Sequence, residues 1–166
     1  MTEPGSAGSA GSAVVITCST RAAGGVYPDR SGPIIVKAVR GWGFTVGDAV
    51  VVADGPDVEA ALRTAISGDA VLVVTTGGTG LTPTDGTPEA TQQVVDRLIP
   101  GIAEAIRSAG VDAGVSSAML SRGICGVAGS TMVVNLPGSM GGVSSGLAVL
   151  EPVVKHAVSQ IQGGDH

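Results

Sequence analysis

Residues 70–78 read AVLVVTTGG, an apolar run that ends in two threonines and two glycines. An uninterrupted run of this kind is typical of a strand buried on both faces of a parallel sheet. Residues 13–19 (AVVITCS) and 44–54 (FTVGDAVVVAD) read as two further strands, and residues 55–68 (GPDVEAALRTAISG) have helical spacing. This alternation of strands and helices predicts an α/β fold.

The remaining elements are predicted from proline positions and apolar spacing. Pro33 is expected just inside the start of one helix, and Thr87 is expected to cap another, with Pro88 as its first residue. The apolar face of that second helix is predicted to run on until Pro100 and Gly101 interrupt it, before a short helix over residues 102–110. The residues of this predicted apolar face are Ala90, Val94, Val95, Leu98 and Ile99.

The last third of the chain predicts a hairpin and a closing helix. Residues 123–127 (GICGV) and 131–136 (TMVVNL) look like strands folded back on one another through a turn at residues 128–130. A helical pattern then starts at Gly142, and Pro152 should break or kink it, because an interior proline removes a hydrogen bond.

Composition excludes several classes of function. The formal charge is −5 and no basic run is present, which argues against nucleic-acid binding. No apolar stretch approaches the length that spans a membrane. Aromatic residues make up only 2% of the chain, so stacking on a flavin ring is not expected. This weakens the alternative of a flavodoxin-like binder.

The loop after the 70–78 run carries the candidate chemistry. Gly77, Gly78 and Gly80 let main-chain N–H groups approach an anion closely, although neither well-known phosphate-loop pattern is present. Asp85 follows them and would repel a bare phosphate unless a cation such as Mg²⁺ lies between. Asp54 ends another predicted strand on the same edge of the sheet. As a single acid it is more commonly a helix cap.

Five motifs stand in a specific order: TTGGTG at residues 75–80, Asp85, TPEAT at 87–91, LSR at 120–122 and NLPGS at 135–139. This combination resembles the MogA/MoaB molybdopterin-binding family, whose eukaryotic relatives include the gephyrin G domain and the plant Cnx proteins. The resemblance runs over about residues 13–161. It implies a three-layer α/β/α sandwich with a mostly parallel central sheet and one antiparallel hairpin strand, usually assembled as a homotrimer.

The resemblance also implies an activity, molybdopterin adenylyltransferase of molybdenum cofactor biosynthesis, with ATP and molybdopterin as substrates and Mg²⁺ as cofactor. Asp54 and Asp85 would be the catalytic and metal-binding acids. The ligand contacts would come from a larger set: Gly77, Gly78, Thr79, Gly80, Ser121, Asn135, Pro137, Gly138 and Ser139. A hand-over of product to a molybdenum-insertion protein is a further expectation.

Two departures from the family pattern affect the site. Some relatives place arginines just before the loop acid, where this chain has LTPT at residues 81–84, so phosphate charge must be met elsewhere. Mg²⁺, main-chain N–H groups, and the arginines 21, 30 and 122 are the candidates. Many relatives also carry an acid where this chain has Thr20.

The implied reaction needs no general base, because its nucleophile is already an anionic phosphate, and positioning with charge neutralisation dominates such transfers. His156 and His166 are therefore expected to be structural or exposed. A non-catalytic molybdopterin-binding or scaffold protein of the same fold is the alternative function. The presence of both acids favours the enzyme, because binding an anionic pterin gains nothing from them.

The sequence also predicts the extent of the folded domain and the state of the two cysteines. Residues 1–12, rich in Gly, Ser and Ala and without a secretion-signal pattern, are expected to be a disordered tail, with one domain over residues 13–166. Cys18 and Cys125 form no C-x-x-C pair and read as reduced core residues of a cytoplasmic protein.

Overall fold

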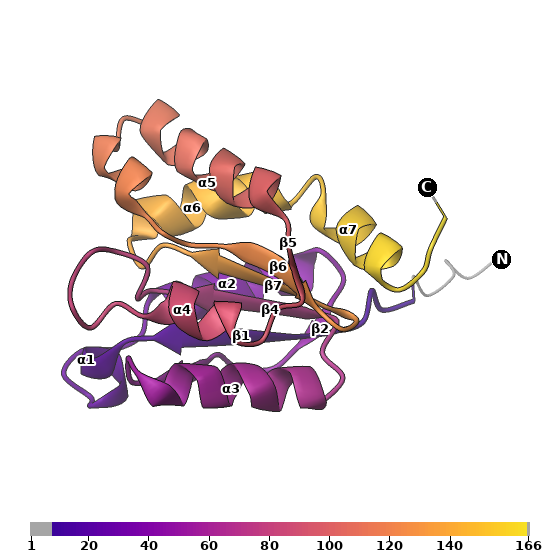
Figure 1. The fold of residues 1–166 in the computed structure, drawn as a ribbon, viewed down its shortest axis with the longest axis horizontal. Helices are drawn as coiled ribbons and strands as arrows, with labels where there is room; N and C mark the ends of the chain where they lie inside the picture. The colour runs from indigo at the N-terminus through magenta and orange to yellow at the C-terminus, as the bar shows by residue number, and fades with distance from the viewer. Residues whose placement is uncertain (1–7, 166) are drawn as a thin grey trace, which may run out of the picture.

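A computed structural model describes residues 8–165, and their strands form one seven-stranded sheet between two layers of helices (Figure 1). The predicted α/β/α sandwich is confirmed. The sheet runs in the order β2-β1-β4-β7-β6-β5, with β3 pairing β1 beside β2. The strands are β1 (Ser12–Cys18), β2 (Thr45–Val46), β3 (Val50–Val52), β4 (Leu72–Thr76), β5 (Arg97–Leu98), β6 (Cys125–Ala128) and β7 (Thr131–Leu136).

The centre of the sheet is parallel and made of apolar strands. In the registers of β1, β4 and β7, Val14 pairs with Val73, and Val74 pairs with Val134. Strand β6 alone among these strands runs against its neighbours β5 and β7. The predicted hairpin with one antiparallel strand is therefore confirmed.

Helices cover both faces and create two separate cores. Because side chains alternate along a strand, Leu72 and Val74 of β4 face one core and Val73 faces the other. The first core packs against α2 (Ser31–Gly41), α5 (Pro100–Asp112), α6 (Met140–Leu150) and α7 (Val154–Ile161). The second packs against α3 (Pro56–Ser67) and α4 (Thr87–Gln92).

The strand predicted over residues 44–54 is interrupted. It forms β2 and β3, which both pair with the same edge of β1 and are separated by Gly47, Asp48 and Ala49. Glycine and aspartate are depleted in strands, which accounts for the gap.

The helical face predicted to run from Ala90 to Ile99 is wrong beyond Gln92. Helix α4 ends there, and Leu98 lies in β5. The edge of the sheet captures this segment, since Asp96 N donates to Val127 O at 2.7 Å and Ile99 N donates to Cys125 O at 2.8 Å. Long-range strand pairing overrides the local helical pattern here.

Several helix starts also differ from the prediction. Pro100 begins α5 instead of interrupting a helix, which suits a residue that lacks an N–H group. Gly86, not Thr87, is the N-cap of α4. Helix α2 starts two residues before Pro33, and α6 starts at Met140, where the Ser139 side chain accepts a hydrogen bond from Gly142 N.

The break at Pro152 is confirmed, because α6 ends at Leu150 and α7 starts at Val154. Of the predicted tail, residues 1–7 lie outside the described residues. The rest is not all tail, since Ala10 N donates to Gly43 O, Thr45 N donates to Gly11 O and Ser12 opens β1. Among the described helices, none is long and apolar enough to cross a membrane.

Loops from distant parts of the sequence meet at one end of the sheet. The short helix α1 (Thr20–Ala23), the loop between β4 and α4, and the turn before α6 lie there (Figure 1). In a parallel sheet this is the edge formed by the carboxyl ends of the strands, where ligands bind.

Candidate active site

The two predicted acids lie in one hollow. We call it the acid cleft; its volume is about 900 Å³, and Asp54 and Asp85 both line it. Asp54 follows β3, and Asp85 lies in the loop before α4. The predicted residues that also line the cleft are Gly77, Gly78, Gly138 and Ser139. Strand ends and loops far apart in the chain thus bring both carboxylates to the same space.

The glycine loop passes very close to its neighbours. Gly77 and Gly78 have φ values of 91° and 67°, which favour glycine. A Cβ atom at Gly77 would collide with Cys18 O, and one at Gly78 would collide with the Thr87 hydroxyl. Both positions therefore require glycine.

Asp54 is held by three hydrogen bonds with Thr20, which run in both directions. Thr20 N and Oγ1 donate to Asp54 Oδ2 at 3.2 and 3.1 Å, and Asp54 N donates back to Thr20 Oγ1 at 3.1 Å. A hydroxyl can donate and accept at the same time, and Thr20 Oγ1 does both here. This arrangement fixes one carboxylate oxygen and leaves the other without a hydrogen-bond partner.

That other oxygen is one of two buried side-chain oxygens without a hydrogen-bond partner in residues 8–165; they are Asp54 Oδ1 and Thr87 Oγ1. Both border Gly78, because a Cβ atom there would lie 3.0 Å from Asp54 Oδ1 and against Thr87 Oγ1. The nearby Cys18 thiol is only a weak partner for a hydroxyl. Buried oxygens are normally satisfied, so an unpartnered pair beside the glycine loop marks a candidate functional position.

Asp29, a third acid of the same cleft, accepts hydrogen bonds with both of its carboxylate oxygens. Asp29 Oδ1 accepts from Gly32 N at 3.0 Å and from the Ser31 hydroxyl at 3.4 Å, and Oδ2 accepts from Thr17 Oγ1 at 2.8 Å. Asp29 thus secures the start of α2. It contrasts with Asp54, whose free oxygen faces the loop.

Asp85 is held by its own loop. Asp85 N donates to Thr82 O at 3.0 Å, and Thr82 N donates to Asp85 Oδ2 at 3.2 Å. Residues 81–84 of the loop are exposed. The carboxylate lies so close to Gly80 that a Cβ atom there would be 2.8 Å from Oδ2.

A second hollow of about 310 Å³, which we call the small hollow, shares Gly77, Gly78, Asp85, Gly138 and Ser139 with the acid cleft. Ser121 Oγ donates to Thr79 Oγ1 at 3.3 Å at its wall. The predicted contact residues that line it are Gly77, Gly78, Thr79, Gly80, Ser121, Pro137, Gly138 and Ser139. The loop and Ser139 border both hollows, so two ligands could meet across them.

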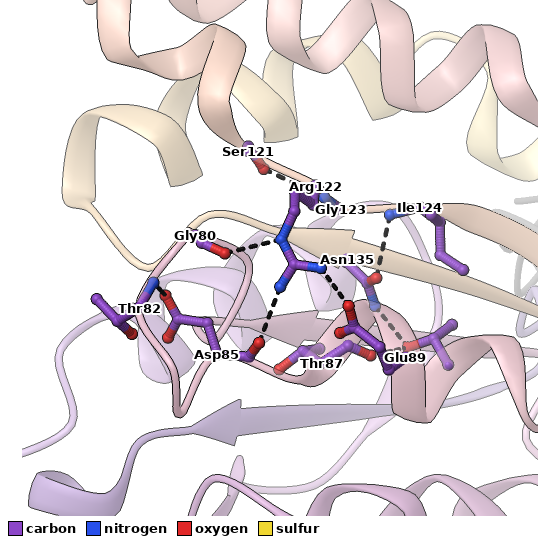
Figure 2. Close-up of polar contacts among 11 residues, drawn as sticks. Gly80, Thr82, Asp85, Thr87, Glu89, Ser121, Arg122, Gly123, Ile124 and Asn135 are labelled. Atoms are coloured by element: carbon purple, nitrogen blue, oxygen red, sulfur yellow. Dashed lines mark hydrogen bonds and ion pairs between the residues drawn. The ribbon is translucent and has the colours of Figure 1, made fainter.

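Asn135 lines neither hollow. Its side chain is only 3% exposed, and Nδ2 donates to the hydroxyls of Thr75 (2.9 Å) and Thr91 (3.0 Å) while Oδ1 accepts from Ile124 N (3.1 Å). These bonds tie β7 to β4, α4 and the segment before β6. Figure 2 shows the bond from Ile124 N to Asn135. Asn135 therefore supports the site from behind it.

The three candidate arginines differ in their position relative to the two hollows. Arg21 and Arg30 line the acid cleft. Arg122 does not line it or the small hollow, because its guanidinium donates to Gly80 O, Asp85 O and the Glu89 carboxylate. Charge for phosphates in the cleft is thus available from Arg21 and Arg30.

Sequence reasoning missed the parts played by Thr20, Thr87 and Asp29. Thr20 was noted only as a departure from the family pattern, and Thr87 only as a helix cap. Their hydroxyls matter because β3 and the glycine loop bring Asp54 beside them. A short-range pattern contains no signal for such contacts.

The two thiols are buried, and the described histidine lies away from the site. Cys18 and Cys125 are buried and free, as predicted, and burial raises the pKa of the Cys18 thiol to about 11 and that of Cys125 to about 12. Both are neutral near pH 7. His156 lies in α7, away from both hollows, and His166 lies outside the described residues. The described residues contain no group of three or more His, Cys, Asp or Glu that could hold a metal ion.

Comparison with known proteins decides the family. Residues 14–156 match the family described as a probable molybdopterin binding domain. The chain belongs to this family. A Mog protein of molybdopterin biosynthesis from Mycobacterium ulcerans is 54% identical, with a TM-score of 0.86 over 90% of this chain and 98% of that one. A molybdopterin biosynthesis protein from Mycobacterium abscessus is 44% identical, with a TM-score of 0.88 over 93% and 98% of the two chains.

Curated family members extend the comparison. A molybdopterin adenylyltransferase from Helicobacter pylori is 32% identical over 90% of this chain and 86% of its own length. A molybdenum cofactor biosynthesis bifunctional protein from Synechococcus elongatus is 42% identical over 93% of this chain. The chain spans only 48% of that bifunctional protein and 22% of the Dictyostelium gephyrin. These likenesses support a role in molybdenum cofactor biosynthesis.

Proposed function

We propose that the chain is a molybdopterin adenylyltransferase, which transfers AMP from ATP to the terminal phosphate of molybdopterin. The observation that carries the proposal is the acid cleft, where Asp54 keeps a buried, unpartnered carboxylate oxygen beside the glycine loop and Asp85 lines the same space. The Helicobacter relative, which is named for this activity, supports it.

The donor set fits a magnesium ion. Mg²⁺ prefers oxygen ligands and is commonly bound through one or two carboxylates together with substrate phosphates, so a dense protein cage is not needed. Asp54 Oδ1 offers a desolvated anionic oxygen, and Asp85 is the second acid of the cleft. These two residues would hold the ion, which neutralises phosphate charge when bound.

The reaction balances without a base. An oxygen of the molybdopterin phosphate attacks the α-phosphorus of ATP, and the bond from that phosphorus to the bridging oxygen of pyrophosphate breaks. The products are adenylyl-molybdopterin and pyrophosphate, and no proton has to leave the nucleophile. The protein therefore acts by holding both phosphates in line and by spreading their charge.

The two hollows suggest how the substrates are arranged. The acid cleft, with Arg21 and Arg30 on its wall, would take the nucleotide triphosphate. The small hollow, with Ser121 and Thr79, would take molybdopterin. Gly77, Gly78, Gly80, Pro137, Gly138 and Ser139 would contact the phosphates between them, and the N-terminus of α6 favours negative charge there. Asn135 would contribute by holding β7 against β4.

The test is to incubate the protein with molybdopterin, Mg·ATP labelled at the α-phosphate, and inorganic pyrophosphatase. We expect label to move from ATP into the pterin, and we expect this to require Mg²⁺. Tight molybdopterin binding without transfer of label would instead identify a binding or scaffold protein. A homotrimer and hand-over to a molybdenum-insertion protein stay predictions.

A further inference from the structure

Arg122 connects the two ends of the loop that contains Asp85. Its Nε donates to Gly80 O at 2.9 Å, its Nη2 donates to Asp85 O at 2.8 Å, and its Nη1 contacts the Glu89 carboxylate. Figure 2 shows the guanidinium between these three groups. One side chain therefore spans the opening of the loop.

The backbone beside Arg122 is attached to the same loop. Arg122 N donates to Thr79 O at 2.8 Å, and the neighbouring Ser121 hydroxyl donates to Thr79 Oγ1 at 3.3 Å. Residues 81–84 between the anchored ends are exposed, and Leu81 keeps 64% of its surface accessible. The loop thus has few other contacts with the body of the protein.

The chemistry of arginine suits this place. A guanidinium presents five N–H donors in a rigid planar fork, so it can meet two carbonyls and a carboxylate at once. A lysine ammonium keeps the charge but cannot span these acceptors with the same geometry. The side chain borders neither the acid cleft nor the small hollow, so its position is unsuited to direct phosphate contact.

We propose that Arg122 is a positioning residue, which fixes the loop from Gly80 to Asp85 so that the Asp85 carboxylate stays in the acid cleft. The expected change in kcat rests on the proposed function, but the expected change in loop exchange does not. The main-chain carbonyl bonds define the position of the loop. The contact with Glu89 contributes less, because that carboxylate side chain is 58% exposed and surface ion pairs are weak.

The experiment compares Arg122→Lys and Arg122→Gln with wild type, and uses Arg63→Lys as a matched control. Arg63 is also paired with a glutamate and a backbone carbonyl, but on the surface of α3. Amide hydrogen exchange over residues 79–87 reports on the loop without requiring activity. Its reporters are the amides of Thr82, Asp85 and Thr87, which are hydrogen-bonded within the loop region.

We expect both Arg122 variants to exchange these amides about tenfold faster, as in a locally opened segment, with Arg63→Lys unchanged. We expect kcat to fall by about 10²-fold, the scale of a small misplacement of a catalytic group, while both KM values stay within about threefold. Unchanged loop exchange in both variants would overturn the proposal. A raised KM for ATP with an unchanged kcat would also overturn it and make Arg122 a phosphate ligand.

Two further results keep the outcome decisive. If wild type transfers no AMP, the proposed function fails, while the exchange data still decide whether Arg122 holds the loop. If the variants do not fold, the wild-type protein answers the question through the Arg122 Nε–H signal. Slow exchange of that proton with water supports a bond to Gly80 O, and free exchange overturns it.

Discussion

Asp54 and Asp85 line the same cleft but are held in different ways. Asp54 follows a strand of the sheet, and Thr20 fixes one of its oxygens while the other stays buried and unpartnered. Asp85 lies on an exposed loop, which depends on its own turn and on Arg122 from 37 residues later in the chain. One acid is therefore placed by strand register, and the other by the hydrogen bonds of the distant Arg122, which we call the Arg122 clamp.

Among the variants of Asp54 and the residues around it, the largest effect is expected from Asp54 itself. Asp54→Asn should lower adenylyl transfer by about 10³-fold, as when a preorganised electrostatic group is removed from an active site. The reason is loss of the anionic oxygen that faces the glycine loop. Steady-state turnover at saturating Mg·ATP measures it.

Asp29→Asn is the matched control for Asp54→Asn. It removes a negative charge from the same cleft, but asparagine can still cap α2. We expect less than about tenfold loss, because the Asp29 charge acts only at a distance. An equal loss in the two variants would show that the cleft depends on total charge instead of on the Asp54 oxygen.

Thr20→Val should have an intermediate effect. Valine keeps the shape of threonine but removes a hydrogen bond to the Asp54 carboxylate, so we expect about tenfold slower transfer. Thr20→Ser keeps the hydroxyl and should restore most of the rate. Titration of both variants with Mn²⁺, followed by electron paramagnetic resonance, would test whether the defect lies in metal binding. Equal rates for the valine variant and wild type would show that Asp54 needs no support.

At Thr87 we expect two smaller effects of opposite sign, a gain in stability and a loss of metal affinity. Thr87→Val removes a buried hydroxyl whose only nearby partner among the described residues is the weakly bonding Cys18 thiol, so the free energy of unfolding should rise by about 1 kcal/mol. The same change should weaken Mn²⁺ binding about threefold if that oxygen supports the ion directly or through water. Chemical denaturation and metal titration measure the two effects, with Thr87→Ser as control. A loss of stability would show that the hydroxyl has a structural partner.

The fold and part of the site could be predicted because they depend on local patterns. Apolar runs marked β1 and β4, and glycines with a following acid marked the loop of Asp85. Leu98 was misplaced because pairing of Asp96 and Ile99 with β6 overrides helical spacing. The clamp of Arg122 and the pairing of Thr20 with Asp54 join residues far apart in sequence, which single-sequence patterns do not relate.

The smallest effect should come from the contact between Arg122 and the exposed Glu89 carboxylate. A hydrogen bond from Arg122 lowers the pKa of Glu89, so the pair stabilises the fold above the ordinary carboxyl pKa of 4.5 and loses this contribution as pH falls through the lowered value. Glu89→Gln should therefore lower the melting temperature only slightly at pH 7, as for most surface ion pairs, and the difference should vanish in acid. Thermal denaturation at several pH values checks this. A large drop at pH 7 would mean that Glu89, and not the carbonyl contacts, holds the clamp.

The proposed function requires the carboxylate charge of Asp85 in the reacting complex. The decisive measurement is transfer of label from α-labelled ATP to molybdopterin by Asp85→Asn at saturating Mg·ATP. Asparagine keeps the size of aspartate and much of its hydrogen bonding but loses its charge, so we expect nearly abolished transfer with molybdopterin binding within a few-fold of wild type. Turnover near the wild-type rate would show that Asp85 is only a turn residue, in which asparagine serves as well as aspartate.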